Sequence, residues 1–227
     1  MTRTTNARVA GIAFLAYIAI GIPTMVLLGR ATRGDGVAAQ LARVADHVPE
    51  MRASIVLTLL MALAALVLGA TFYALTRDVD PDLALLGFAC RVGEGVLGAF
   101  PITILGLLWL ATVRGADAPD PAAARATAAF LLKAGEWKTT IGATMFAVGS
   151  ALFSWLLLRG RMVPAGLAWL GVFASIVLAL ALPLRLVGIM RGEIVQALWI
   201  PMALFEIPLA LWFIVKGVRP SLREVAK

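Results

Sequence analysis

Long apolar runs separated by shorter polar stretches extend along almost the whole chain. A helix needs roughly 20 apolar residues to cross a bilayer core. On that basis we predict six spans, at about 9–29, 53–75, 83–112, 138–158, 163–184 and 194–216. Only helices or closed barrels pair all backbone polar groups in lipid, and a barrel would show short alternating segments instead. The pattern therefore predicts an all-α integral membrane bundle, with residues 1–227 forming a single six-helix transmembrane domain.

Two of the connections between these spans are long enough to hold further helices. The loop 31–52 carries apolar residues at helical spacing, namely Val37, Leu41, Val44 and Val48. We expect a short amphipathic helix there, at the membrane interface. In the loop 113–137, Asp120 precedes Pro121, which are favoured residues for a helix N-cap and first turn. An alanine-rich helix is expected to start at this point and to lead toward, or directly into, the fourth span.

The composition supports a membrane protein and excludes several other classes. Hydrophobic residues make up 61% of the chain and charged residues 15%, whereas about a quarter of a soluble domain is charged. The net charge of +7 is scattered over the loops without a nucleic-acid motif, so we expect lipid and not nucleic acid as the partner. Cys90 is the single cysteine and His47 the single histidine, so we expect no metal site and no cofactor.

An even number of spans places both termini on one side of the membrane. Lysine and arginine residues outside the spans divide almost evenly between the two sides, so the positive-inside rule decides little. The C-terminal tail contributes three of them: Arg219, Arg223 and Lys227. Acidic residues are fewer on the side of the termini, which favours slightly a multi-pass protein of the cell membrane with both termini in the cytoplasm.

Arg91 and Glu94 interrupt the third apolar run one helical turn apart. An ion at mid-helix costs about 2.5–3.5 kcal/mol on the insertion scale, and each large apolar residue returns only about 0.3–0.6 kcal/mol. The third span therefore needs partners within the protein. Three-four spacing places the two ions on one face with small and apolar residues: Gly95, Gly98, Ile102 and Leu105. We predict that this face points into the bundle, because glycines allow close approach of a neighbouring helix.

Glu206 lies far from either end of the sixth run, between Pro201 and Pro208. At 1.5 Å per residue, Glu94 and Glu206 both come out about 15–17 Å from the side of the termini. We therefore predict a buried polar cluster of Arg91, Glu94 and Glu206 near the midplane. A proline also frees the carbonyl four residues earlier in its helix, and Pro101 does so in the third span.

Two further spans carry stripes of small and polar residues that we expect to face the interior. In the second span the stripe comprises Ser54, Thr58, Ala62, Ala65 and Gly69. In the fourth it comprises Glu136, Thr140, Thr144, Ala147, Ala151 and Ser154. Glu136, Thr140 and Thr144 are therefore secondary candidates for a polar site.

Several stretches together resemble a bacterial six-helix membrane family known only as "domain of unknown function 4386". The stretches are ARVAGIAFLAYIAIG, MRASIVLTLLM, LALLGFACRVGEGVLG, IGATMFAVGSALFSWLLLRGRMVPAGLAWLGV and FEIPLALWFIVKGV. Their order and spacing carry the resemblance. It implies the six-helix topology, an Arg-x-x-Glu pair at Arg91 and Glu94, an arginine before the second span at Arg52, and a late glutamate at Glu206. It implies no reaction.

Three functions remain open at this level. The cluster could form a pocket that handles protons or a small polar or lipidic ligand, as proline-broken helices do in transporters. It could supply acid and base groups, Glu94 and Glu206, to an enzyme acting on a lipid or isoprenoid. It could instead clamp helices together in a structural or regulatory membrane subunit, with or without formation of a homo-oligomer.

Overall fold

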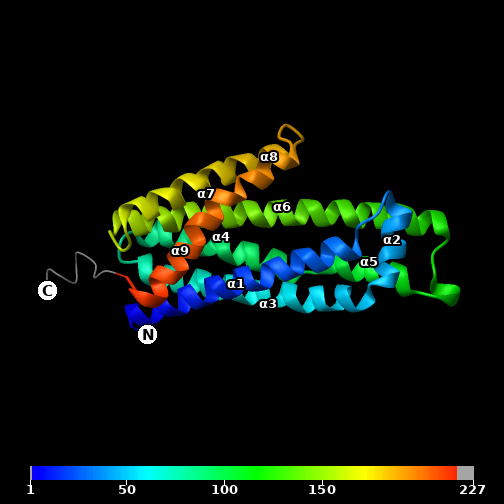
Figure 1. Ribbon diagram of the computed structural model, residues 1–227, viewed down its shortest axis with the longest axis horizontal. Helices are drawn as coiled ribbons and strands as arrows, with labels where there is room; N and C mark the ends of the chain where they lie inside the picture. Colours follow the sequence, from blue (N-terminus) through cyan, green and yellow to red (C-terminus); the bar gives the residue numbers. More distant parts are fainter. Residues whose placement is uncertain (1, 219–227) are drawn as a thin grey trace.

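The computed structural model describes residues 2–218, and this part of the chain is helical and contains no strand (Figure 1). The α-helices are α1 (Arg3–Ala31), α2 (Val37–Asp46), α3 (Val48–Thr76), α4 (Pro81–Ala99), α5 (Ile102–Thr112), α6 (Pro121–Arg159), α7 (Ala165–Leu186), α8 (Gly192–Ala197) and α9 (Trp199–Val215). A 3-10 turn, η1 (Gly115–Asp117), lies between α5 and α6. The tail residues Arg219, Arg223 and Lys227 lie outside the described residues.

Within residues 2–218, six segments are long and apolar enough to cross a membrane: Arg3–Ala31, Val48–Thr76, Pro81–Thr112, Pro121–Arg159, Ala165–Leu186 and Gly192–Val215. The predicted all-α membrane fold is thus confirmed. The first helix begins at Arg3, six residues before the predicted start, because the Thr2 hydroxyl accepts a hydrogen bond from the backbone N–H of Thr5 at 3.2 Å and caps the helix.

The third span is broken into α4 and α5 at Phe100 and Pro101. Proline lacks an N–H and disfavours helical geometry in the residue before it, and Phe100 accordingly has φ −102° and ψ 84°. The break changes which face of the following helix is buried. Ile102 and Leu105 are 67% and 46% exposed, so the prediction that they share the inward face of Arg91 is wrong. The buried residues of α5 are Thr103, Ile104, Leu107, Leu110 and Ala111.

Helix α6 starts at Pro121 and runs unbroken through the fourth span, as the sequence allowed. Its 39 residues extend about 58 Å, well beyond the roughly 30 Å of a hydrocarbon core. Its first turns therefore project from the membrane. The Asp120 carboxylate caps them by accepting hydrogen bonds from the N–H groups of Ala122 at 2.9 Å and Ala123 at 3.0 Å.

Removal of this cap is expected to loosen the start of α6. The N–H groups of Ala123 and Ala122 hold the pKa of Asp120 below its usual value. The cap therefore contributes fully above the ordinary carboxyl pKa, and its contribution is lost as the pH falls through the lowered value. Hydrogen exchange should be faster at residues 122–125 in Asp120→Ala and should stay near normal in Asp120→Asn, which still caps. Equal exchange in the two variants would contradict this assignment.

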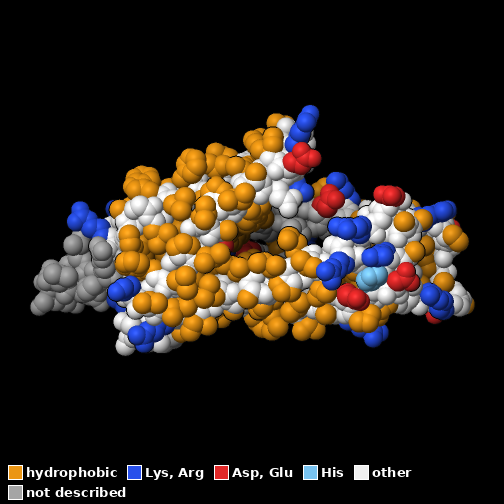
Figure 2. All heavy atoms as spheres, viewed as in Figure 1, with side chains coloured by type: hydrophobic (Ala, Val, Ile, Leu, Met, Phe, Trp, Pro, Cys, Tyr) orange, Lys and Arg blue, Asp and Glu red, His pale blue; other side chains and the backbone are white. Residues whose placement is uncertain are grey.

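A short helix is present in the first long loop, as predicted, and it closes one end of the molecule (Figure 1). Its Val44 is 1% exposed. A small apolar core lies beneath it, formed by Ala31, Val44, Met51, Ile104, Leu107, Leu110, Ala111 and Ala128. Charged side chains gather over this end, whereas the middle of the molecule presents mainly apolar side chains (Figure 2). The apolar middle is the part that fits a bilayer.

The larger core lies among α1, α3, α4, α6, α7 and α9. In Figure 1, α7 and the α8–α9 segment diverge from α6, and α9 crosses the bundle in front. Helix α9 packs against α1 and α7. The start of α1 and the end of α9 lie at the same end of the molecule (Figure 1). The predicted stripe of α3 faces the interior: Ser54, Ala62, Ala65 and Gly69 are buried, and Thr58 is half-buried.

Candidate functional site

Arg91 and Glu94 form a buried ion pair on α4. The Arg91 Nη1 donates to Glu94 Oε2 at 2.7 Å, and the two side chains are only 2% and 8% exposed. Two glycines give the arginine its space. A Cβ on Gly69 of α3 would lie 2.9 Å from the Arg91 Cβ, and one on Gly149 of α6 would lie 3.4 Å from its Cδ. Close approach of α3 and α6 thus encloses the ion pair in protein.

Tyr17 of α1 completes the coordination of Glu94. Its hydroxyl donates a hydrogen bond of 2.6 Å to Glu94 Oε1, so both carboxylate oxygens are bonded. The Arg91 guanidinium also lies 4.9 Å from the ring centre of Phe146 and 5.8 Å from that of Tyr17. Rings at this distance stabilise a cation. The ion pair therefore connects α1, α4 and α6.

Sequence reasoning missed Tyr17, although a signal was present. Interfacial tyrosines favour the ends of membrane helices, and Tyr17 lies in the middle of α1. A hydroxyl at that depth needs a partner inside the protein, because lipid offers none.

Glu206 reaches the same interior from α9 and is 7% exposed. Its Oε1 is buried and has no hydrogen-bond partner within residues 2–218. No ion pair joins it to Arg91 in that range, yet both Arg91 and Glu94 are close enough to act on it electrostatically. The structure therefore gathers all three predicted residues, with Arg91 bonded to Glu94 and Glu206 beside the pair.

The secondary candidates do not join this cluster. Arg52 is exposed at the start of α3. Thr140 and Thr144 donate to carbonyl oxygens of their own helix, four residues earlier, at 2.9 and 2.8 Å. Glu136 is exposed and pairs with Lys133 at 2.8 Å, so the prediction that Glu136 faces the interior is wrong. Helix α7, which packs along α6, is only about 33 Å long and ends near the level of Glu136, so it does not cover that residue.

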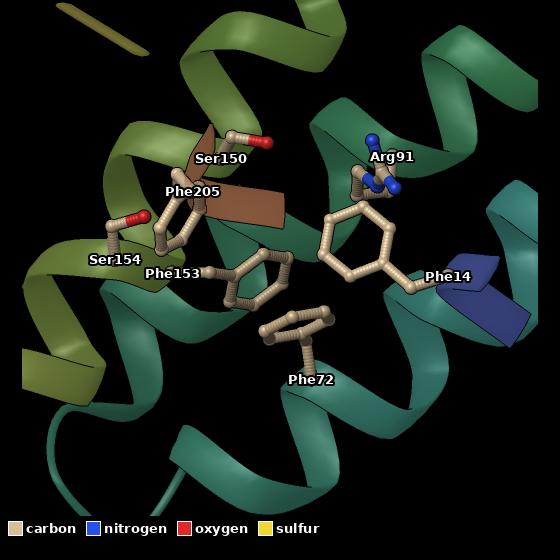
Figure 3. A pocket seen from close by; sticks show the side chains of 7 residues that line it. All are labelled: Phe14, Phe72, Arg91, Ser150, Phe153, Ser154 and Phe205. Atoms are coloured by element: carbon tan, nitrogen blue, oxygen red, sulfur yellow. The ribbon is translucent and has the colours of Figure 1, made fainter. Parts of the chain in front are cut away.

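A surface hollow and a small internal cavity lie near the buried charges. Figure 2 shows a hollow on the front face, between the α8–α9 segment and α1, with acidic side-chain atoms visible at its base. Inside the bundle, a cavity with room for about one water molecule is lined by Phe14, Phe72, Arg91, Ser150, Phe153, Ser154 and Phe205 (Figure 3). Within the described residues, no group of histidine, cysteine or acidic side chains is arranged to hold a metal ion.

The order of these features along the chain matches one known family over residues 9–217, namely Domain of unknown function (DUF4386). The chain belongs to this family. No curated protein and no solved structure matches it. The resemblance noted from the sequence is thereby confirmed. This DUF4386 protein carries six candidate membrane helices with a buried Arg91–Glu94 pair and a buried Glu206. These candidate spans indicate a multi-pass membrane protein.

The charge balance of the site defines its chemistry. One guanidinium faces two carboxyl groups, and both oxygens of Glu94 are already bonded. A buried carboxylate without a partner is costly in a medium of low polarity. A proton bound by Glu206 would remove the unbalanced charge and leave the Arg91–Glu94 pair intact.

Proposed function

We propose that this DUF4386 protein binds and releases a proton at Glu206, inside the membrane, next to the Arg91–Glu94 ion pair. The observation that carries the proposal is the buried Oε1 of Glu206, a carboxyl oxygen that has no hydrogen-bond partner within residues 2–218. Intramembrane carboxyl groups of this kind are typical of proton-handling proteins. The breaks between α4 and α5 and between α8 and α9 provide joints in the two segments that carry the carboxyl groups, both on the side of the site away from the termini.

The size of the enclosed space favours a proton over a larger ligand. The cavity beside Arg91 has room for about one water molecule, and its lining includes neither Glu94 nor Glu206. A lipid or isoprenoid substrate would need an enclosed volume that holds both carboxyl groups together, so the enzyme hypothesis has less support. We further propose that both termini lie in the cytoplasm.

A structural clamp is the second candidate, and one observation favours it. Tyr17, Glu94 and Arg91 join three helices through short hydrogen bonds and ring contacts. This chain of contacts accounts for the pair but not for Glu206, whose carboxyl group bonds to none of the three.

Infrared spectroscopy of the purified protein in lipid tests the proton site. We expect a carbonyl-stretch band of a protonated buried carboxyl group that disappears reversibly as the pH rises. The band should be absent in Glu206→Gln, which keeps the shape but cannot titrate. Glu136→Gln is the matched control, because Glu136 is exposed on α6 and should leave the band unchanged. A band that persists in Glu206→Gln would overturn the proposal.

A further inference from the structure

The cavity beside Arg91 has polar groups on two helices and aromatic walls. Four of its lining residues are the phenylalanines Phe14, Phe72, Phe153 and Phe205. The other three are Arg91 of α4 and Ser150 and Ser154 of α6, and in Figure 3 both serine hydroxyls point from α6 toward the centre of this group. The side chains of all three are at least nine-tenths buried, at 2%, 8% and 1% exposed.

These two serines differ from the three threonines in the middle of their helix. Thr139, Thr140 and Thr144 each donate to the carbonyl oxygen four residues earlier. Such a bond satisfies a hydroxyl without any outside partner. The side-chain hydroxyls of Ser150 and Ser154 make no hydrogen bond to any residue between 2 and 218, and they border the cavity instead.

Arg91 likewise has donors to spare on the cavity side. A guanidinium carries five N–H groups, and the bond to Glu94 uses one. The cavity thus offers one arginine and two hydroxyls around a volume that suits one water molecule. A buried water typically makes about three hydrogen bonds, which equals the number of polar side chains available.

We propose that this cavity binds one ordered water molecule, held by Arg91, Ser150 and Ser154, and that this water is the point of proton entry from the end of the bundle where the termini lie. The first half stands on the cavity alone. The second half rests on the proposed protonation of Glu206.

The positions along the helices support the direction of entry. Ser154 and Ser150 lie about 8 and 14 Å from Arg159, the residue that ends α6 at the side of the termini. Arg91 lies about 15 Å from Pro81 and Glu206 about 14 Å from Val215, both measured from that same side. The two serines thus lie at successive depths between the surface at the side of the termini and the level of the Glu206 carboxyl group. As a proton reaches the bound water from the side of the termini, the water would pass one of its own protons to the Glu206 carboxylate and so remain neutral water.

The phenylalanine rings between the cavity and the termini would control this entry. Phe72 stacks on Phe153 with ring centres 5.0 Å apart, and Phe14 and Phe213 pack on Phe72 at 6.0 and 5.7 Å. Phe72, Phe153 and Phe213 lie about 6, 9 and 3 Å from the ends of their helices at the side of the termini, so proton passage past them would require their side chains to move.

The test uses Ser150→Ala, Ser154→Ala and the double variant in the full-length protein. Ser175→Ala is the matched control, since Ser175 is buried on α7 and bonds the Met202 sulfur, away from the cavity. Infrared difference spectra in ¹⁸O-labelled water report a buried water molecule through its isotope-shifted stretch. We expect this band in wild type and control and its loss in the double variant. A band unchanged in the double variant would overturn the water site.

A pH-jump measurement then tests the route. Protonation of Glu206, followed by its carboxyl band, should slow by about tenfold in the double variant, the factor that one hydrogen bond corresponds to. An unchanged rate together with a lost water band would overturn the route and leave the water site standing. Absence of any titrating band that depends on Glu206 would instead refute the proposed function. Thermal melts check that each alanine variant is folded.

Discussion

Replacement of Arg91 by methionine is expected to lower the free energy of unfolding by about 3–5 kcal/mol, the cost of leaving a buried ion without its partner. Arg91 is 2% exposed and is the bonded cation of Glu94. Methionine matches the length of the arginine stem but carries no charge, so Glu94 would keep only the hydrogen bond from Tyr17. Thermal or denaturant unfolding of the purified protein in detergent measures the effect.

Two companion variants separate the charge effect from lost packing. Arg91→Met combined with Glu94→Leu removes both ions, and it should recover much of the stability, because a well-packed apolar pair often replaces a buried ion pair at little cost. Arg159→Met removes the ion pair between Arg159 and Asp80, which are 3.1 Å apart. Because the Arg159 side chain is 54% exposed, the free energy of unfolding should fall by only about 0–1 kcal/mol. Equal losses in Arg91→Met and Arg159→Met would show that the buried pair does not hold the bundle together.

The pattern of the chain predicted those features that depend on local composition and spacing. The apolar runs are enough to define six spans, since lipid requires each to be a continuous apolar helix. The Arg91–Glu94 pair follows from one-turn spacing, because residues three apart share a helix face. The start of α6 follows from Asp120 and Pro121, whose preference for helix starts is local.

The errors arise where tertiary geometry decides. Ile102 and Leu105 were expected on the inward face, but the break at Phe100 and Pro101 reorients the following helix. Glu136 shares a stripe with Thr140, yet α7 ends near its level and leaves it exposed. A sequence pattern predicts which residues share a face of one helix, but it does not predict how far the neighbouring helix extends along that face.

The hydrogen bond of Tyr17 is a contact that the sequence pattern did not predict. Its hydroxyl meets Glu94 across 77 positions of sequence, and this meeting depends on α1 and α4 both packing against α3. The cavity at Ser150 and Ser154 is also a product of packing, because it depends on how four phenylalanine rings from α1, α3, α6 and α9 fill the interior. Burial of polar groups could be predicted from the sequence, but their partners could not.

Gly171→Val is expected to be the second most damaging substitution, because it separates α7 from the helices that carry the site. A Cβ at Gly171 would meet the ring of Phe205 and lie 2.6 Å from Ser154 Oγ. Phe205 adjoins Glu206 and, like Ser154, lines the cavity. Neither neighbour has open space to move into, as Phe205 is 2% exposed and Ser154 1% exposed. Overpacking of this kind costs about 1–3 kcal/mol and occasionally more.

Gly166→Val is the matched control on the same helix, since nothing lies within 4 Å of a Cβ built there. It should leave the melting temperature almost unchanged, whereas Gly171→Val should lower it by several degrees, a shift typical of 1–3 kcal/mol in a chain of this size. If Phe205 is the obstacle, a second substitution of Phe205 by leucine should restore part of the lost stability, because the smaller side chain makes room for the added methyl groups. Failure of that rescue, with Gly166→Val normal, would place the obstruction at Ser154 instead.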